Sequence, residues 1–299
     1  ERIGELMHRA LRLSWRGRPG VVHLTVPEDI MNGEFDEPAL PDVAPERYRR
    51  TVAIEPPADL VDAAARMLVE AEAPLIHAGS GVLHAMATDE LRAVAEALAA
   101  PVTTSWAGRD VIDERLDVSV PMSYPQLVDQ ARTDADVVLA VGTRFAETDW
   151  WGKAPHWRTP DTLRVVQVDA DEELLGVNKP VDLAVLGDAK EFLARLADRR
   201  AAADLADDLA ARRSAREQRL AGYRASLNET RGMLDGALAA HSDPLHTAHL
   251  PAVMRRTLPD DTVFVLDGGT TPVWGMLYHE VRRPHRMVTT VDKFGMLGA

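Results

Sequence analysis

Apolar residues along this chain form two kinds of pattern. Short, largely apolar runs stand at 74–78, 102–105, 137–141, 164–168 and 183–186. The segments between them carry apolar residues at helical spacing, as in 60–71, 88–99 and 126–133. Repeated strand, turn and helix units with apolar strands indicate a parallel sheet covered by helices on both faces. We therefore predict that residues 59–196 form a Rossmann-like α/β domain.

Glycines and aspartates follow the predicted strands. Because parallel strands end at the same edge of a sheet, Gly79, Gly142 and Asp169 are predicted to lie on one edge. Acids at such strand ends often cap the next helix, and this explains Asp169 and Asp171 better than a ribose contact does. A ribose contact is the minority interpretation.

Two of these turns could approach a phosphate. Gly79-Ser80-Gly81 is a poor dinucleotide fingerprint, because His84 stands at the third glycine position and no acid closes the next strand. Gly142-Thr143-Arg144-Phe145 adds an arginine that could pair with a phosphate or carboxylate. A tight strand-to-helix turn explains both segments about equally well, so both interpretations stay open.

The N-terminal residues differ from this pattern. Glu1 to Trp15 has a helical apolar period, which the turn Gly17-Arg18-Pro19-Gly20 ends. Val21 to Val26 is predicted as a short buried strand, and residues 1–34 are assigned to one unit. Residues 35–58, rich in proline and acids, are predicted to be an extended linker.

The C-terminal third begins with a long predicted helix. Lys190 to Met233 has almost no Gly or Pro, with Gly222 as the candidate position for a break, and residues 197–240 are assigned as a helical linker. Residues 241–299 begin a new α/β unit. We predict a helix at Leu250 to Leu258, a second helix through Trp274 to Glu280, and strands at Thr262 to Leu266 and Met287 to Val291.

Composition excludes several classes of protein. No apolar run is long enough to span a bilayer, and the first residues lack a signal-peptide core. The net charge of −13 argues against non-specific nucleic-acid binding, which needs clustered Lys and Arg. Cysteine is absent, which excludes disulfides and fits a cytoplasmic location.

The turn Asp267-Gly268-Gly269-Thr270-Thr271 is the strongest candidate site. It follows a predicted strand at its carboxyl end, where open parallel sheets bind ligands. Two glycines let backbone amides approach an anion, and the two threonines lead into a helix N-terminus. The phosphate-binding interpretation is slightly favoured over a plain turn.

Histidines and tryptophans give weaker signals. His241, His246 and His249 do not share one helical face, so no metal ligand is assigned in this chain. Trp150, Trp151 and Trp157 are predicted to pack against another domain or subunit, with a substrate wall as the minority alternative.

Several stretches, in order, resemble the acetolactate-synthase-like family of thiamine-diphosphate-dependent enzymes. Residues 18–27 resemble the closing strand of its pyrimidine-binding domain. Five stretches resemble the central domain of this family: residues 73–81, 100–104, 135–145, 166–171 and 185–190. Asp267-Gly268-Gly269-Thr270-Thr271 and Phe294-Gly295-Met296-Leu297-Gly298 resemble the opening of its pyrophosphate-binding domain. Each motif is moderately specific, whereas their joint order and spacing are strongly so.

The resemblance implies a Rossmann-like central domain flanked by partial α/β thiamine-diphosphate-binding domains, in a homodimer or homotetramer. It also implies carboligation or decarboxylation of a 2-keto acid through a thiazolium ylid. By position, Gly268, Gly269, Thr270 and Thr271 would hold the diphosphate. In the stretch Gly295-Met296-Leu297, Gly295 would bind the aminopyrimidine through its carbonyl and Leu297 would bend the cofactor.

Some family features are missing. The family's catalytic glutamate would precede Glu1 and its magnesium motif would follow Ala299, so no catalytic residue is assigned here and the chain is predicted to be an inactive fragment. Acetolactate synthases carry Gln and His where Thr270 and Thr271 stand. The flavin-contacting pattern after Phe145 is changed to Ala146-Glu147-Thr148, so no tightly bound FAD is expected; ADP is left open. A catalytically inactive, nucleotide-binding module is the alternative.

Overall fold

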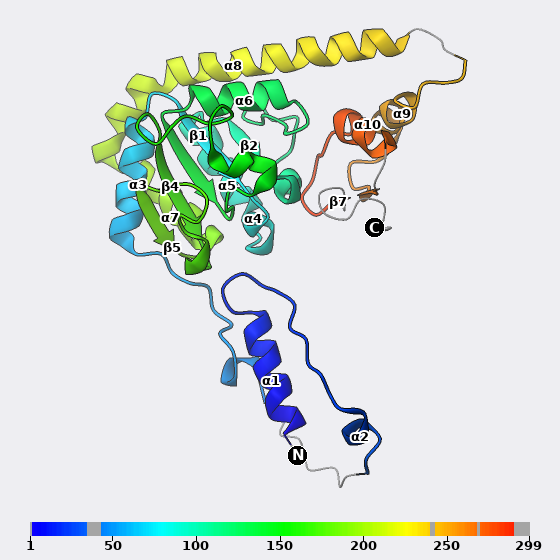
Figure 1. The fold of residues 1–299 in the computed structure, drawn as a ribbon. Coiled ribbons are helices and arrows are strands. Elements are labelled where there is room, and N and C mark those ends of the chain that lie inside the picture. Colours follow the sequence, from blue (N-terminus) through cyan, green and yellow to red (C-terminus); the bar gives the residue numbers. More distant parts are fainter. Residues whose placement is uncertain (1, 35–42, 240–242, 268–269, 290–299) are drawn as a thin grey trace.

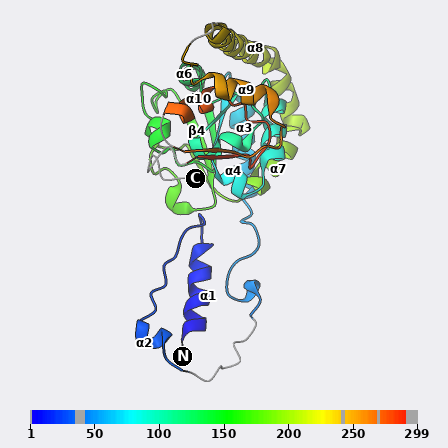
Figure 2. The same ribbon diagram turned by 90° about the vertical axis from the view of Figure 1, so that its right-hand side faces the viewer.

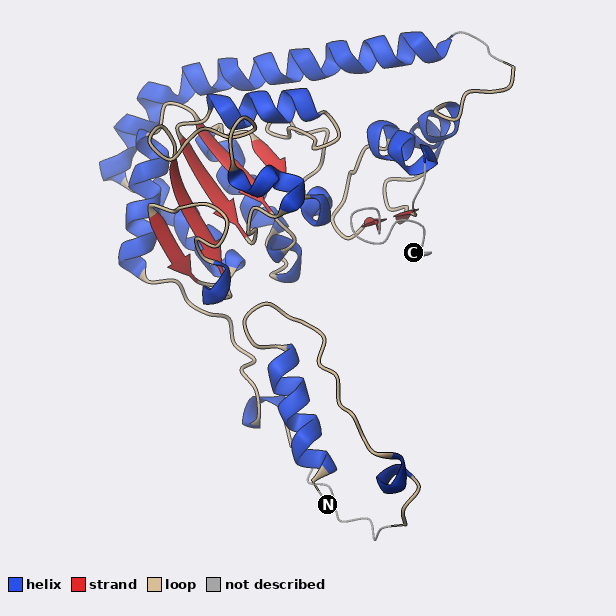
Figure 3. Ribbon diagram, viewed as in Figure 1, coloured by secondary structure: helices blue, strands red, loops and turns tan. Residues whose placement is uncertain are grey.

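A five-stranded parallel sheet forms the centre of the molecule. The computed structural model describes residues 2–34, 43–239, 243–267 and 270–289. The strand order is β2-β1-β3-β4-β5, and every neighbouring pair is parallel (Figures 1 and 3). The strands are β1 (Pro74–Ala78), β2 (Val102–Thr104), β3 (Val137–Val141), β4 (Arg164–Asp169) and β5 (Leu183–Leu186). The predicted parallel α/β domain is confirmed.

Helices cover both faces of this sheet, as a sheet of fully apolar strands requires. One face packs against α3 (Ala58–Glu70), α5 (Thr88–Leu98) and α7 (Ala189–Arg200), with Ile76, Leu139 and Val166 completely buried beneath them. The other face packs against α6 (Pro125–Asp134) and the loop that follows β3. Shorter elements connect these layers: α4 (Gly81–His84), η2 (Trp106–Val111), η3 (Glu147–Gly152) and η4 (Glu172–Leu174).

The strand order reverses between β1 and β3. The chain passes from β1 to β2 on one side and then returns to place β3 on the other. Gly79, Gly142 and Asp169 stand at the carboxyl ends of β1, β3 and β4, so the prediction that they share one edge is confirmed. Connections that diverge at such a point leave a crevice in which α/β proteins bind ligands.

The long helix is broken, but not where we predicted. Helix α7 ends at Arg200 and α8 (Ala203–Ala239) begins three residues later, whereas Gly222 lies inside the continuous α8. A glycine costs a helix only about 1 kcal/mol relative to alanine, and tertiary packing overrides that amount. Tyr223 and Leu227, which follow Gly222 on α8, are buried against α6 and the second face of the sheet. The prediction of a break at Gly222 is therefore wrong.

The N-terminal segment extends away from the sheet (Figures 1 and 2). Its elements are α1 (Ile3–Ser14), α2 (Glu28–Met31) and η1 (Pro45–Arg47). The helix is confirmed, but the predicted strand from Val21 to Val26 is not, since Val21 is fully exposed and no described strand pairs with this stretch. A strand needs a neighbour for its backbone hydrogen bonds, and none lies beside it here.

The C-terminal unit follows the end of α8 (Figure 1). With 37 residues and a rise of about 1.5 Å per residue, α8 is about 55 Å long. It contains α9 (His249–Thr257), β6 (Phe264–Leu266), α10 (Thr270–Tyr278) and β7 (Met287–Thr289), with β6 and β7 paired in parallel. Helix α10 begins before the predicted Trp274 and ends at Tyr278. The predicted strands are present in shorter form, with residues after Thr289 outside the described part.

No helix in the described ranges has both the length and the apolar character needed to cross a bilayer.

Candidate functional site

A cavity of about 590 Å³ lies at the carboxyl edge of the central sheet. Residues just past β1, β3, β4 and β5 form one wall, and the N-terminal segment, including Trp15 and residues 49–54, forms the opposite wall. In Figure 1 the carboxyl ends of the strands point toward that segment. The cavity lies at the reversal of strand order, and its volume is within the range of about 300–1,000 Å³ that is usual for ligand pockets.

The glycines at this edge have a packing role. A Cβ atom on Gly79 would lie 2.2 Å from the carbonyl oxygen of Gly142, and one on Gly81 would lie 2.5 Å from the Gly142 Cα. Gly142 itself has φ +59°, which side chains rarely tolerate. The tight-turn interpretation of both segments is thus confirmed. Gly81 and Gly142 also line the cavity, so a ligand contact by the same turns stays a prediction.

The aspartates at this edge cap local structure, as we predicted. Asp171 accepts a hydrogen bond from the Glu173 amide at the start of η4, at 3.2 Å. Asp169 accepts one from the Asp171 amide at 3.0 Å, and burial raises the pKa of the Asp169 carboxyl. Asp188 caps α7 through the amides of Lys190 and Glu191. These hydrogen bonds need no ligand to explain them.

Arg144 is the cavity's best candidate for an anion contact. It follows the tight turn after β3, and its backbone carbonyl accepts a hydrogen bond from Asn178 Nδ2 at 2.9 Å. Its guanidinium makes no ion pair with any described residue. An arginine held at its backbone and free at its side chain can bind a phosphate or carboxylate through two parallel hydrogen bonds.

A buried polar network that the sequence analysis missed lies beside the cavity. His77 on β1 is completely buried, and its Nε2 is 3.2 Å from Asp149 Oδ1. Arg132 on α6 binds the same oxygen at 2.9 Å. His77 Nδ1 lies 3.1 Å from the Thr103 hydroxyl on β2. The contact of Nε2 with Asp149 is a close polar approach and not an aligned hydrogen bond, while the tautomer of His77 sets whether Nδ1 donates to or accepts from the Thr103 hydroxyl.

Charges within this network balance. Burial lowers the pKa of His77, so its imidazole stays neutral. Burial by itself would raise the pKa of Asp149, but the neighbouring His77 and Arg132 outweigh it and the pKa is lowered. The result is a buried aspartate–arginine pair with a neutral histidine. Asp149 lines the cavity, and its Oδ2 has no hydrogen-bond partner among the described residues.

The tryptophan loop divides into a buried and an exposed part. Trp157 is buried, donates to the Asp149 carbonyl at 2.8 Å and packs edge-on against His77. Trp150 and Trp151 have positive φ and are 49% and 42% exposed, and Trp150 stacks on His156 of the same loop, so their packing against another subunit stays a prediction. Trp157 thus packs within the central domain, not against another domain or subunit as we predicted for this loop. The cavity wall instead contains Trp15 and Trp106.

The residues predicted to bind thiamine diphosphate lie mostly outside the described part. Gly268, Gly269 and the stretch Gly295-Met296-Leu297 belong to the residues whose structure is not described. Thr270 and Thr271 begin α10, which follows β6 after the short connection that contains Asp267. A strand and a helix therefore flank the two glycines in the sequence, as predicted, and the roles of these residues stay predictions.

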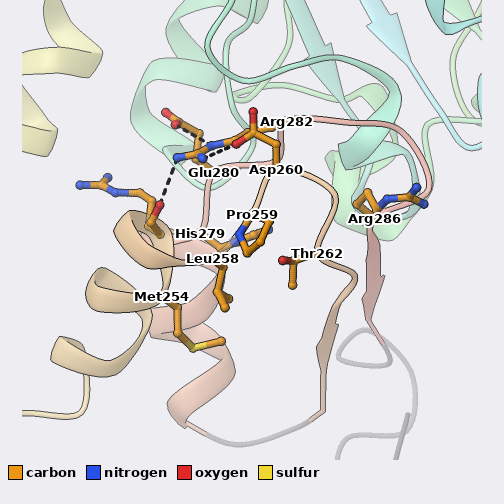
Figure 4. Close-up of a pocket in the computed structure, with 10 residues that line it drawn as sticks. Met254, Leu258, Pro259, Asp260, Thr262, His279, Glu280, Arg282 and Arg286 are labelled. Atoms are coloured by element: carbon orange, nitrogen blue, oxygen red, sulfur yellow. Dashed lines mark hydrogen bonds and ion pairs between the residues drawn. The ribbon is translucent and has the colours of Figure 1, made fainter.

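A second hollow in the C-terminal unit is too small for a substrate. Its volume is about 20 Å³, enough for about one water molecule. Arg282 closes it through ion pairs with Asp260, at 2.6 Å, and Glu280, at 3.6 Å (Figure 4). Beside it, His279 stacks on Phe264, and burial lowers the pKa of His279 to about 4. Among the described residues, no group of three or more His, Asp or Glu side chains could hold a metal ion.

The fold and its cavity define a class of protein that sequence comparison identifies. Residues 61–196 match the family described as the thiamine pyrophosphate enzyme central domain. This stretch of the chain therefore belongs to that central-domain family, as its resemblance to the acetolactate-synthase-like proteins indicated.

Relatives of the chain carry several activities. It is 34% identical to the acetolactate synthase large subunit of Parasynechococcus marenigrum, over 66% of this chain and 32% of the relative. It is 31% identical to the sulfoacetaldehyde acetyltransferase of Castellaniella defragrans, over 71% and 38%. A Pseudomonas aeruginosa protein assigned as a 2-ketoarginine decarboxylase is 33% identical, over 66% and 34%. The aligned part spans about one third of each relative's length.

A solved structure shares the fold. The X-ray structure of a Mycobacterium smegmatis protein assigned as a thiamin diphosphate-dependent enzyme has a TM-score of 0.67 and 22% sequence identity. It covers 97% of this chain and 51% of that protein. The shared architecture thus extends beyond the central domain, into both flanking segments.

Proposed function

We propose that this chain is part of an enzyme that uses thiamine diphosphate to act on a 2-keto acid, by carboligation or decarboxylation. The observation that carries the proposal is the order of β6, the Asp267 to Thr271 turn and α10, placed after a central domain of this family. The names of the relatives support it, since an acetolactate synthase, an acetyltransferase and a decarboxylase are each 31–34% identical to this chain over about two thirds of its length.

The C-terminal turn fits a diphosphate. The N-terminal end of a helix offers unpaired backbone amides and a partial positive charge, and Thr270 and Thr271 of this stretch are the first two residues of α10. Gly268 and Gly269 would let these amides approach the anion, while Thr270 and Thr271 would donate hydroxyl hydrogen bonds. When bound, the cofactor supplies a carbon nucleophile for the substrate carbonyl. Gly295, Met296 and Leu297 would hold and orient its ring system.

Three further features belong to the proposal. A diphosphate carries several negative charges that amides and hydroxyls do not neutralise, so a hard cation such as Mg²⁺ is required. We also propose that the full-length protein forms a homodimer or homotetramer and is cytoplasmic. The lack of cysteine supports the cytoplasmic location.

The full-length protein is expected to consume pyruvate or another 2-keto acid only when both thiamine diphosphate and Mg²⁺ are present, whereas residues 1–299 alone are expected to be inactive. The physical reason is that general acid–base assistance, worth about 10²–10⁴-fold, has no assigned residue in this chain. Calorimetric titration of the cofactor and a keto-acid assay on both proteins test it. Turnover without the cofactor contradicts the proposal; nucleotide binding with no cofactor requirement would favour the inactive module.

For the central cavity, we infer an adenine nucleotide rather than a flavin. Gly81, Gly142 and Arg144 on its wall suit the phosphate groups of a nucleotide. The residues after Phe145 support the exclusion of flavin. In place of the family's flavin-contacting pattern, Ala146 leads into the kinked η3, whose Asp149 is already bound to His77 and Arg132.

Replacing Arg144 with methionine is expected to weaken ADP binding about tenfold to 100-fold, because a hydrogen bond to a charged group is worth about 1.5–3 kcal/mol. Arg164→Met is the matched control, since Arg164 is exposed at the opposite end of β4. Calorimetry with ADP and with FAD measures both affinities. A stoichiometric yellow flavin in the purified full-length protein, or equal ADP affinity in both variants, would overturn the inference.

A further inference from the structure

A completely buried ion pair connects the central domain to the C-terminal unit. Arg109 in η2 binds Glu114 through two hydrogen bonds, Nε to Oε1 at 2.7 Å and Nη2 to Oε2 at 3.0 Å. Both residues are 2% exposed. The planar guanidinium of Arg109 binds the Glu114 carboxylate through two parallel hydrogen bonds. This geometry fixes the relative orientation of the two side chains more strictly than a lysine in place of Arg109 would.

The remaining hydrogen bonds of the pair go to the C-terminal unit. Arg109 Nη2 donates to the His279 carbonyl at 2.8 Å. The Val281 amide donates to Glu114 Oε2 at 2.9 Å, and the Glu114 amide donates to the Val281 carbonyl at 2.9 Å. Arg109 Nη1 lies 3.5 Å from the sulfur of Met276. Each contact is to α10 or to the three residues after it.

A neighbouring acid holds the strand that follows. Asp110 is 3% exposed, and its Oδ2 accepts from the amides of Arg286 and Met287 at 3.0 and 3.3 Å. Apolar packing joins the same two regions, since Trp106 packs against the buried cluster of Phe264, Leu266 and Met276. Leu266 is the last residue of β6, directly before the Asp267 turn. Residues 106–114 therefore contact α10, β6 and β7 together.

Stability alone does not account for such a pair. The desolvation of two buried charges costs about as much as their attraction returns, and apolar pairs of similar volume are often as stable. What the pair provides is a fixed geometry. Helix α10 has nine residues and spans about 13 Å. A helix this short is rigid, so holding its C-terminal end also places its N-terminal end.

We propose that Arg109 and Glu114 are positioning residues for the diphosphate turn. By holding residues 279 and 281, they set the position of α10, whose first turn is the proposed diphosphate site. This inference rests on the proposed function. It assigns to the central domain a role in cofactor binding that does not depend on any ligand in its own cavity.

The test is made on the full-length protein with saturating Mg²⁺. The double variant Arg109→Met/Glu114→Leu keeps the volume and removes the fork. It is expected to retain its thermal unfolding midpoint within a few degrees, to raise the Kd for thiamine diphosphate about tenfold or more, and to speed amide exchange across residues 270–287. Arg109→Lys is expected to recover part of the affinity.

Two further variants keep the result decisive. Glu114→Gln keeps the shape of the side chain and is also expected to raise the Kd for thiamine diphosphate. It therefore tests the proposal even if the double variant does not fold. Arg92→Met/Glu96→Leu removes an exposed pair on α5 and is expected to change neither quantity. Unchanged cofactor Kd in Glu114→Gln and in a folded double variant overturns the positioning role. Wild-type protein that binds no cofactor instead overturns the proposed function, and the positioning role with it.

Discussion

Replacing Gly269 with valine in the full-length protein is expected to weaken binding of thiamine diphosphate by about 100-fold or more, with Mg²⁺ present throughout. In sequence, Gly269 lies between Asp267 and the start of α10, where we propose that backbone amides approach the diphosphate closely. A branched side chain would keep the anion away from at least two amides. Hydrogen bonds to a charged group are worth about 1.5–3 kcal/mol each, so losing two costs about 10²–10⁴ in affinity.

Calorimetric titration of the cofactor measures this change directly. Gly222→Ala is the matched control, because Gly222 is in α8 with open space where a Cβ would stand. That variant is expected to bind the cofactor as the wild type does and to be slightly more stable, since alanine favours helix. If Gly269→Val binds thiamine diphosphate with wild-type affinity, the turn does not hold the diphosphate.

The second large effect is expected from Arg216, which joins α8 to the central domain. This arginine is 1% exposed and has no acidic hydrogen-bond partner among the described residues. Its Nη1 donates to the Leu98 carbonyl at 3.0 Å, and its Nη2 donates to the carbonyls of Leu68, Val69 and Ala71. These carbonyls stand at the C-terminal ends of α3 and α5, where helix dipoles favour a cation.

Arg216→Met is therefore expected to destabilise the protein by about 3 kcal/mol or more, because several helix-end carbonyls lose their donor and each buried polar group left unsatisfied costs about 1–3 kcal/mol. Burial lowers the pKa of Arg216 to about 10, so it remains charged at neutral pH. Arg216→Lys is expected to recover only part of the loss, because one ammonium cannot reach the ends of both helices. Urea unfolding of each variant gives the free energies.

The control for Arg216 lies one turn earlier on α8. Arg213 is half exposed and pairs with Glu217 at 2.8 Å, so Arg213→Met is expected to cost less than about 1 kcal/mol. Equal losses in the two variants would show that Arg216 does not act through its buried hydrogen bonds.

Local sequence was sufficient to predict the central domain. The apolar runs at β1 and β3 are buried at every position, which a period of two or of 3.6 would not allow. Continuous apolar strands between helical segments have one common solution, a parallel sheet with helices on both faces. The edge shared by Gly79, Gly142 and Asp169 followed from that arrangement, because it depends on strand direction alone.

What the sequence left open depended on pairings between distant residues. His77 and Asp149 are 72 positions apart, and nothing in either local pattern indicates that they meet. Arg216 lies in the segment that we assigned as a helical linker, and packing of α8 buries it against two helix ends. The predicted strand at Val21 to Val26 failed for the same kind of reason, since its apolar pattern had no neighbouring strand.

Apolar periodicity is a property of a few consecutive residues, so the sequence by itself determined the strands, most helices and the sheet edge that carries the cavity. A buried polar group is stable only when particular partners from other elements reach it. The Arg132–Asp149–His77 network and the Arg109–Glu114 pair were therefore decided by the tertiary structure, which alone brings those elements within hydrogen-bonding distance.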